Sequence, residues 1–162
     1  MATLATSTRF FHAGLTKVYF LPVVASALLV PTRAEITSGT DLSAEIADLA
    51  GWTVSSGEID CPDLGTTFTG KIPGRTSTDD CSLTFYQDKT GADVRTLLPR
   101  DTAGFIMFAD GGDVTGNKAD VFPIRVRSNG KLRSVGDESA RLMIPFSITR
   151  KPAESIALPA TV

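Results

Sequence analysis

The stretch Ser82–Asp113 constrains the fold most, because its sequence predicts two strands with one short helix between them. Ser82–Tyr86 alternates apolar and polar side chains, which is typical of a half-buried strand. Gly104–Ala109 is apolar on both faces and predicts a strand covered twice, by a partner sheet and by the helix or a neighbouring subunit. The glycines of Asp110–Asp113 predict a turn. Between the strands, three apolar residues predict one or two helical turns: Val94, Leu97 and Leu98.

Periodicity in the rest of the chain predicts a mainly β fold, a β-sandwich or barrel of about eight strands with one or two short flanking helices. Asn129-Gly130 predicts a type I′ hairpin, and Pro145 predicts an edge position or a bulge in the last strand. Gly74–Asp80 is expected to be a loop. The further predicted strands are Lys17–Phe20, Pro31–Ile36, two within Trp52–Gly74, Phe122–Arg127 and Arg141–Thr149.

One more helix is predicted before the tryptophan, because Leu42, Ile46 and Leu49 recur at helical spacing. Thr40 or Asp41 is positioned to cap it, and Gly51 is a plausible stop. The expected organisation is a flexible N-terminal arm over residues 1–15, a single β domain over residues 16–150, and a C-terminal tail over residues 151–162.

The apolar run Val18–Val30 supports two interpretations. It follows Lys17 and contains Ala25-Ser26-Ala27, so it imitates a cleaved secretory signal. The run also fits a first strand followed by an irregular apolar segment, since Pro22 divides it early. Residue chemistry alone does not separate the two.

Charge is unevenly distributed, although the net charge is only −2. Ala34–Gly70 contains many acidic residues and no lysine or arginine, whereas Pro123–Lys151 is mainly basic. The two segments are either solvated faces or complementary surfaces that meet between copies of the chain. The near-neutral total argues against tight binding of nucleic acid through phosphate neutralisation.

No catalytic, cofactor or metal site is predicted. His12, the one histidine, lies in the expected arm, and paired carboxylates such as Asp79-Asp80 are more typical of solvated loops. Asp110, Asp113, Asn117 and Asp120 lack the spacing of a calcium loop. Cys61 and Cys81 make no disulfide framework, and two reduced, buried thiols are favoured over one bridge.

Four segments in order carry a resemblance to a known family: PTRAEITSGTDLSAEIADLAGW, LTFYQDKTGADVRTLLPRDTAGFIMFADGGD, ADVFPIRVRS and FSIT. Over roughly Lys17–Pro152 the chain resembles the major tail proteins, or tail tube proteins, of long, non-contractile-tailed phages of actinobacteria. The residues before Lys17 and the cysteine pair have no counterpart in this resemblance.

The resemblance implies a β-sandwich with a flanking helix, shared with contractile tail tubes and the Hcp-type tube of type VI secretion. It implies a structural virion protein, not an enzyme, that needs no cofactor and no membrane and assembles in the host cytoplasm. Hexameric rings would stack into a tube whose lumen houses the tape measure protein and passes DNA during ejection. Tail terminator and distal tail proteins would bind the ends of this tube.

In that family a long loop or hairpin contacts the adjacent ring, and Ser55–Arg75 matches it by position. No lumen-lining residue is assigned. The alternative function is a secreted β-sandwich binding module with a cleaved N-terminal signal. Residues expected to contact other copies are Glu58, Asp60, Asp63, Leu64, Phe68, Lys71, Arg75, Ile106, Phe108, Arg125 and Arg127.

Overall fold

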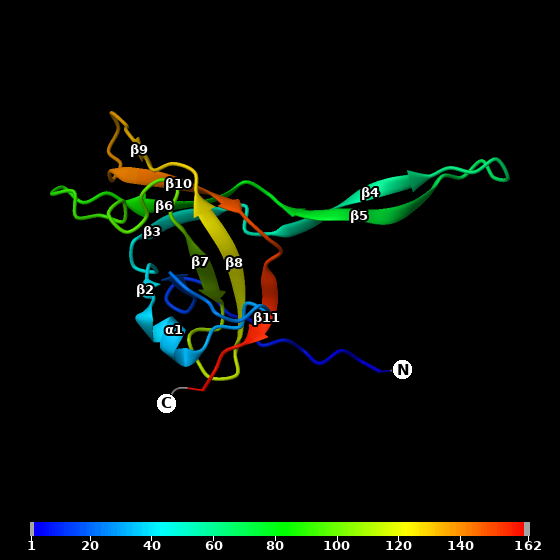
Figure 1. Ribbon diagram of the computed structural model, residues 1–162, viewed down its shortest axis with the longest axis horizontal. Helices are drawn as coiled ribbons and strands as arrows, with labels where there is room; N and C mark the ends of the chain where they lie inside the picture. Colours follow the sequence, from blue (N-terminus) through cyan, green and yellow to red (C-terminus); the bar gives the residue numbers. More distant parts are fainter. Residues whose placement is uncertain (1, 161–162) are drawn as a thin grey trace. The chain divides into compact units, whose positions relative to one another are not determined.

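The computed structural model of the protein describes residues 2–160 and holds, within that range, eleven strands and one α-helix (Figure 1). Residue 1 and residues 161–162, at the ends of the predicted arm and tail, lie outside the described residues. The prediction of a mainly β fold is confirmed. The chain forms two compact units: the first comprises the residues up to Ala44, Gly104–Phe122 and those from Ala153 onward, and the second comprises Glu45–Ala103 and Pro123–Pro152.

The first unit is built on antiparallel strands in the order β2-β1-β7-β8, with β11 paired to the beginning of β8. Before β1, the described part of the predicted arm contains no helix or strand, and residues 2–11 are exposed. The elements are β1 (Lys17–Leu21), α1 (Arg33–Ser38), β2 (Thr40–Asp41), β7 (Ala103–Ala109), β8 (Lys118–Val126) and β11 (Ala153–Ala157).

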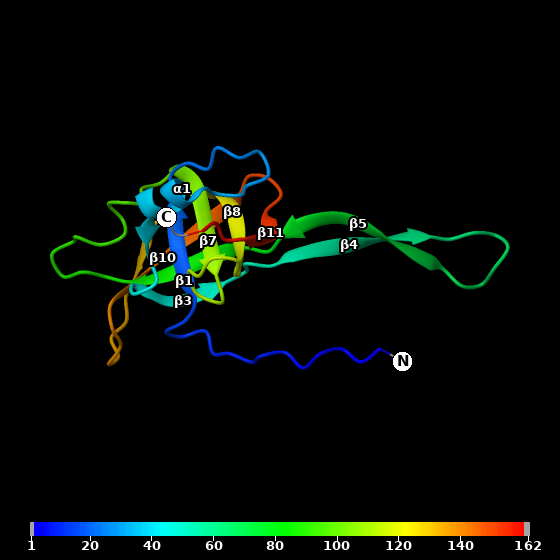
Figure 2. The same ribbon diagram turned by 90° about the horizontal axis from the view of Figure 1, so that it is seen from below.

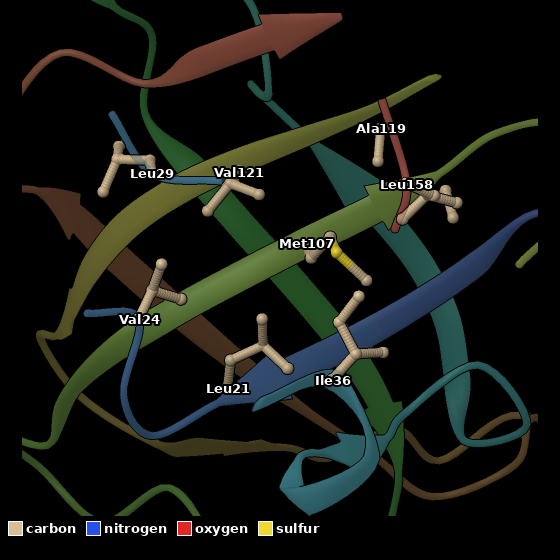
Figure 3. Packing of buried hydrophobic residues seen from close by; sticks show 9 residues of the cluster. Leu21, Val24, Leu29, Ile36, Met107, Ala119, Val121 and Leu158 are labelled. Carbon is tan, nitrogen blue, oxygen red and sulfur yellow. The ribbon is translucent and has the colours of Figure 1, made fainter. Parts of the chain in front are cut away.

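The core of the first unit gathers apolar side chains from its strands, from α1 and from the segment after β1 (Figure 3). The run Val18–Val30 therefore folds as strand β1 and core, as its second interpretation predicts. Both faces of β7 are covered inside the chain, since Ile106, Met107 and Ala109 are all fully buried. The members of this cluster are Leu21, Val24, Leu29, Ile36, Met107, Ala109, Ala119, Val121 and Leu158.

Helix α1 replaces the strand predicted at Pro31–Ile36, so that prediction is wrong. Thr32 is its N-cap, and the Glu35 carboxylate accepts hydrogen bonds from the backbone N–H groups of Thr32 and Ala25, both at 2.7 Å. These bonds hold the pKa of Glu35 below its usual value. The Thr-x-x-Glu capping box outweighs the short alternation that suggested a strand. Among the described residues, no helix has the length and apolar character needed to cross a membrane.

The helix predicted to begin at Thr40 or Asp41 is absent, and the chain forms β2, a turn and β3 (Ile46–Ala50) instead. Asp41 does accept the Ser43 backbone N–H at 2.9 Å, as a cap would. The bond starts only a turn, because β3 pairs antiparallel with β6 (Cys81–Tyr86). Distant strand pairing has overridden helical spacing.

The second unit contains antiparallel strands in the order β8-β10-β6-β3, where β8 contributes its last residues. It also contains the two-stranded sheet β4-β5, and β9 pairs with the beginning of β10. Alternate residues of β6 are fully buried, as its predicted alternation requires. The remaining elements are β4 (Val54–Cys61), β5 (Gly70–Thr78), β9 (Gly130–Leu132) and β10 (Arg141–Ile148).

Pro145 lies inside the sheet, because β10 is flanked by β6 and β8, and the predicted edge position is wrong. On the β8 side, β9 pairs with β10 up to Met143 and β8 pairs from Phe146 onward. Pro145 falls in the gap between these ladders and still accepts the Arg127 backbone N–H at 2.9 Å. A missing N–H therefore costs no ladder bond here.

Two predicted turns differ from the structure. The helix expected at Val94–Leu98 is a single turn closed by the Leu98 N–H to Val94 carbonyl bond of 2.9 Å, and it buries only Leu98 fully. Asn129-Gly130 makes no β8–β9 hairpin, because β9 pairs with β10 rather than with β8. The local turn signal is overridden by this pairing.

Two segments expected to lack strands contain them. β5 continues through Thr78 into the predicted loop Gly74–Asp80, paired along its length with β4. Ala153–Ala157, in the predicted tail, forms β11 against β8 with an irregular register. Leu158 then enters the core of the first unit, so the C-terminal segment is integral to that unit.

Gly51, which follows β3, is expected to tolerate no side chain. Its φ is +79°, and an added Cβ would lie 2.2 Å from the Asp80 carbonyl oxygen. We expect Gly51→Ala to lower the free energy of unfolding by roughly 2–4 kcal/mol, through left-handed strain and a backbone clash. Gly91→Ala is the matched control, because Gly91 has φ +86° and open space around it. Equal losses in urea denaturation would show that φ alone matters at both glycines.

Candidate assembly surface

Hairpin β4–β5 projects away from the other strands of the second unit (Figures 1 and 2). The predicted pair of strands joined by a long connection is confirmed, with Val54 opposite Thr78 at the base and Cys61 opposite Gly70 near the tip. A register shift between Ser56 and Glu58 bends the ladder. Two-stranded hairpins are only marginally stable alone in water, so such a projection gains from a partner.

The hairpin exposes most of the apolar side chains that it carries. Ile59 and Ile72 face each other across the ladder and are each 51% exposed. At the tip, Leu64 is fully exposed and Phe68 is 77% exposed. The Asp63 carboxylate accepts the Gly65 backbone N–H at 2.7 Å and turns the chain there. Clustered exposed apolar groups of this kind mark interaction surfaces.

The hairpin also uses part of its charge internally. Lys71 Nζ lies 2.7 Å from a Glu58 carboxylate oxygen and 3.7 Å from one of Asp60. These groups are all more than half exposed, so the pairs orient side chains more than they stabilise the fold. Toward the tip, Asp63 and the exposed apolar residues remain for a partner.

The other predicted contact residues divide into three groups. Arg75 is exposed on β5. Arg125 and Arg127 are bound within the second unit, to Asp101 at 2.7 Å and to Asp80 at 3.0 Å. Ile106 is fully buried and Phe108 is nearly so, with the Phe108 ring packed edge-on against Phe122. Because the chain itself covers them, these two side chains offer almost no surface to another copy.

A basic groove of about 500 Å³ lies beside β9, and sequence reasoning missed it. Lys131, Arg133 and Arg141 line it together with Glu138. The basic bias of Pro123–Lys151 was the available signal, but only the β9–β10 pairing, with Arg141 opposite Leu132, brings these cations together.

A second groove, of about 490 Å³, lies at the base of the hairpin. Val54 and Thr78 of the hairpin line it with the Asp80–Arg127 ion pair and the end of β10. Its lining mixes the acidic Asp79 and Asp80 with the basic Arg127, Arg150 and Lys151. It offers no concentration of one charge to select a partner.

The residues considered for catalysis or metal binding serve the fold. Both carboxylate oxygens of Asp113 accept hydrogen bonds from the Arg33 guanidinium, at 2.8 and 2.9 Å. Asn117 donates to the Gly111 carbonyl at 2.7 Å, and Asp120 accepts the Ser155 backbone N–H at 2.7 Å. Nowhere between residues 2 and 160 do three or more His, Cys, Asp or Glu side chains gather as a metal site.

His12 and the two cysteines are also accounted for. The His12 ring lies 2.9 Å from the Thr16 hydroxyl on an exposed surface. Both cysteines are free: Cys81 is buried, as expected, but Cys61 is exposed on the hairpin, so the prediction of two buried thiols is half wrong. Burial raises the pKa of the Cys81 thiol, which donates to the Gly51 carbonyl at 3.0 Å.

Tyr19 belongs to a polar cluster of the first unit. Its hydroxyl donates to Asp113 at 3.4 Å, and Asp113 also holds Arg33. Burial, followed by the negative charge of Asp113, raises the pKa of Tyr19 to about 12. The Arg33 guanidinium in turn donates to the Pro159 carbonyl at 3.0 Å and connects the C-terminal segment to α1.

This cluster predicts a stability loss at high pH. Because the folded pKa of Tyr19 lies above the unfolded value of about 10, the stabilisation is complete below pH ~10 and is lost as pH rises toward the folded value. Tyr19→Phe should flatten this decline in urea denaturation. A Tyr86→Phe chain isolates Tyr19 for absorbance titration. A Tyr19 titration at the ordinary tyrosine value would contradict the prediction.

Comparison with known proteins identifies the family. The sequence profile of a family described as phage tail tube protein matches residues 4–161. Comparison with curated proteins gives no match. Among solved structures, a chain of the cryo-EM structure of the anti-feeding prophage baseplate, six-fold symmetrised, is similar, with a TM-score of 0.54 and 9% identity. The match covers 94% of this chain and 95% of that chain.

The two findings carry different weight. At 9% identity the structural likeness concerns the fold alone, over nearly the whole of both chains. The profile match spans almost every residue, and the family is one of structural proteins rather than enzymes. The chain therefore belongs to the phage tail tube protein family and is a structural component of the virion.

Proposed function

We propose that this protein builds the tube of a long, non-contractile phage tail by forming hexameric rings that stack. The observation that carries the proposal is hairpin β4–β5, which exposes the apolar side chains of Leu64 and Phe68 to water. Such exposure is unfavourable in a chain that stays monomeric and is relieved when a partner covers the two side chains. Burying such groups between copies supplies the driving force for assembly. The six-fold symmetry named for the similar baseplate structure supports six copies per ring.

The rest of the proposal concerns the lumen and the ends of the tube. The tape measure protein would occupy the lumen before DNA passes through it during ejection. Tail terminator and distal tail proteins would close the two ends, and assembly would take place in the cytoplasm of an actinobacterial host. A surface for DNA passage needs few fixed cations, and Ala34–Gly70, without lysine or arginine, suits it.

Electron microscopy of the purified, untagged protein tests this proposal. We expect rings or tubes with a central channel and six-fold symmetry. Monomers at high protein concentration would contradict it.

Intact-mass measurement on protein from the native host is a second test. We expect residues 2–27 to be retained, because β1 and Val24 belong to the core of the first unit. Cleavage near Ala27 would favour a secreted binding module instead.

A further inference from the structure

We propose that the hairpin tip, residues 60–70, docks in the basic groove beside β9 of another copy of the chain. The inference rests on the proposed self-assembly and names the surface that receives the hairpin. The basic groove is the one lined by Lys131, Arg133 and Arg141.

The hairpin tip is acidic and apolar at once. Asp60 and Asp63 are its charged residues. Lys71, just beyond the tip, lies 3.7 Å from Asp60 on the exposed surface, so Asp63 is the carboxylate farther from that cation along the hairpin. Leu64 and Phe68 present their side chains to solvent. The tip has internal order as well, because Asp63 and Thr66 accept backbone N–H groups two residues on, at 2.7 and 3.1 Å. A partner must therefore offer cations beside an apolar surface.

The basic groove offers this combination. Three cations line it against the single carboxylate of Glu138. Leu132 of β9, also in the lining, is 46% exposed. Val135, in the loop that follows β9, is outside the lining and is fully exposed. At about 500 Å³ the groove lies within the size range of clefts that hold drug-sized groups, enough for a few side chains.

Hydrogen-bonded backbone holds the segments that line the groove. β9 pairs with β10 through Arg141–Leu132, Leu142–Lys131 and Met143–Gly130. The Gln87 backbone N–H donates to the Ala140 carbonyl at 2.9 Å and holds the loop from its other side. Lys131 and Arg141 are thus presented from paired strands, which lowers the ordering cost of docking, and Arg133 lies one residue beyond the end of β9.

Other occupants fit the groove less well. The N-terminal arm exposes Leu4, Phe10 and Phe11, but its charged residue is Arg9, which the cations would repel. Nucleic acid would meet Glu138 and the exposed apolar Leu132 rather than a continuous cationic surface. The hairpin tip matches in both charge and apolar character.

The positions of the hairpin tip and the basic groove require that the contact form between different copies of the chain. Within the second unit, the hairpin tip and the loop after β9 lie at opposite ends (Figures 1 and 2). One copy therefore cannot fill its own groove. A head-to-tail contact between different surfaces propagates into rings or filaments, as growth of a tube requires.

Charge exchange in the full-length chain tests this docking. We expect Arg133→Glu with Arg141→Glu, and separately Asp60→Lys with Asp63→Lys, to raise the protein concentration needed for tubes by about a hundredfold or more, because like charges would then face each other. Combining all four changes in one chain should restore assembly. Lys89→Glu with Arg100→Glu, the same charge change at exposed positions of the second unit, should leave it unchanged.

Several outcomes would overturn the docking. Tubes from the groove variant at the wild-type concentration would do so, as would failure of the four-residue exchange in a chain that circular dichroism shows to be folded. Should that chain misfold, the neutral pair Arg133→Gln and Arg141→Gln decides: unchanged assembly overturns the docking, and a raised threshold supports it. A groove variant that assembles normally but loses DNA oligonucleotide binding would make the groove a nucleic-acid site. Monomeric wild-type protein would instead overturn the proposed function.

Discussion

Replacing Leu64 and Phe68 with serine is expected to prevent tube formation at the concentration at which the wild-type protein assembles, while leaving the chain folded. Each side chain loses roughly 1.5–3 kcal/mol of burial at every contact it would make with another copy. The threshold concentration for assembly should therefore rise by more than about a hundredfold. Stability should change by less than about 0.5 kcal/mol, because both residues are already exposed in the isolated chain. Electron microscopy and sedimentation, with urea denaturation alongside, measure the two effects.

The matched control is a pair of exposed valines in the first unit, Val23 and Val114, which are 63% and 58% exposed. Replacing both with serine removes a similar apolar character from a surface to which no docking is assigned. We expect tubes at the wild-type concentration from this control. Normal assembly of the Leu64 and Phe68 variant would show that the hairpin tip is not a contact surface.

The strands that sequence analysis located best are those with a strict period of two. β6 and β10 face the core with Leu83 and Phe85 and with Leu142 and Ile144, and both strands were predicted almost to their ends. β11 was missed because its register against β8 is irregular and its residues do not alternate between buried and exposed. Without that alternation the sequence has no local period of two to detect.

Errors near the N-terminus have a different cause, which is that short segments fit two patterns. Leu42, Ile46 and Leu49 have helical spacing, but Leu42 alone among them is buried. The strand predicted at Pro31–Ile36 became α1 through the bond network of Thr32 and Glu35. The Thr-x-x-Glu pattern of this capping box is present in the sequence and predicts a helix that begins after Thr32.

The candidate surface was predictable in part. Its hairpin residues follow from a long segment that is poor in apolar groups, and Leu64 and Phe68 are exposed. Ile106 and Phe108 were proposed from a doubly apolar strand, but the chain itself supplies the second cover. The basic groove could not be read, because Lys131 and Arg141 become neighbours only through the β9–β10 ladder.

Phe85→Ala should have the largest effect on stability, a loss of about 3–5 kcal/mol. Phe85 is fully buried in β6, with Leu142 opposite it on β10 and Ile46 opposite it on β3. A cavity there removes contacts on both sides of the strand. Tyr86→Ala is the control, because Tyr86 is 43% exposed and should lose less than about 1 kcal/mol. Urea denaturation compares the two.

Equal losses for the two variants would contradict the register of β6, since a shift by one residue would exchange the buried and exposed faces. The two large predictions also separate stability from assembly. β6 follows hairpin β4–β5 directly, so Phe85→Ala weakens the frame from which the hairpin projects. Its tubes should fail only where the chain itself begins to unfold. The serine variant of Leu64 and Phe68 should fail to form tubes at the wild-type concentration at every temperature at which the chain is folded. It loses the apolar contact with another copy, while the strands that support the hairpin stay intact.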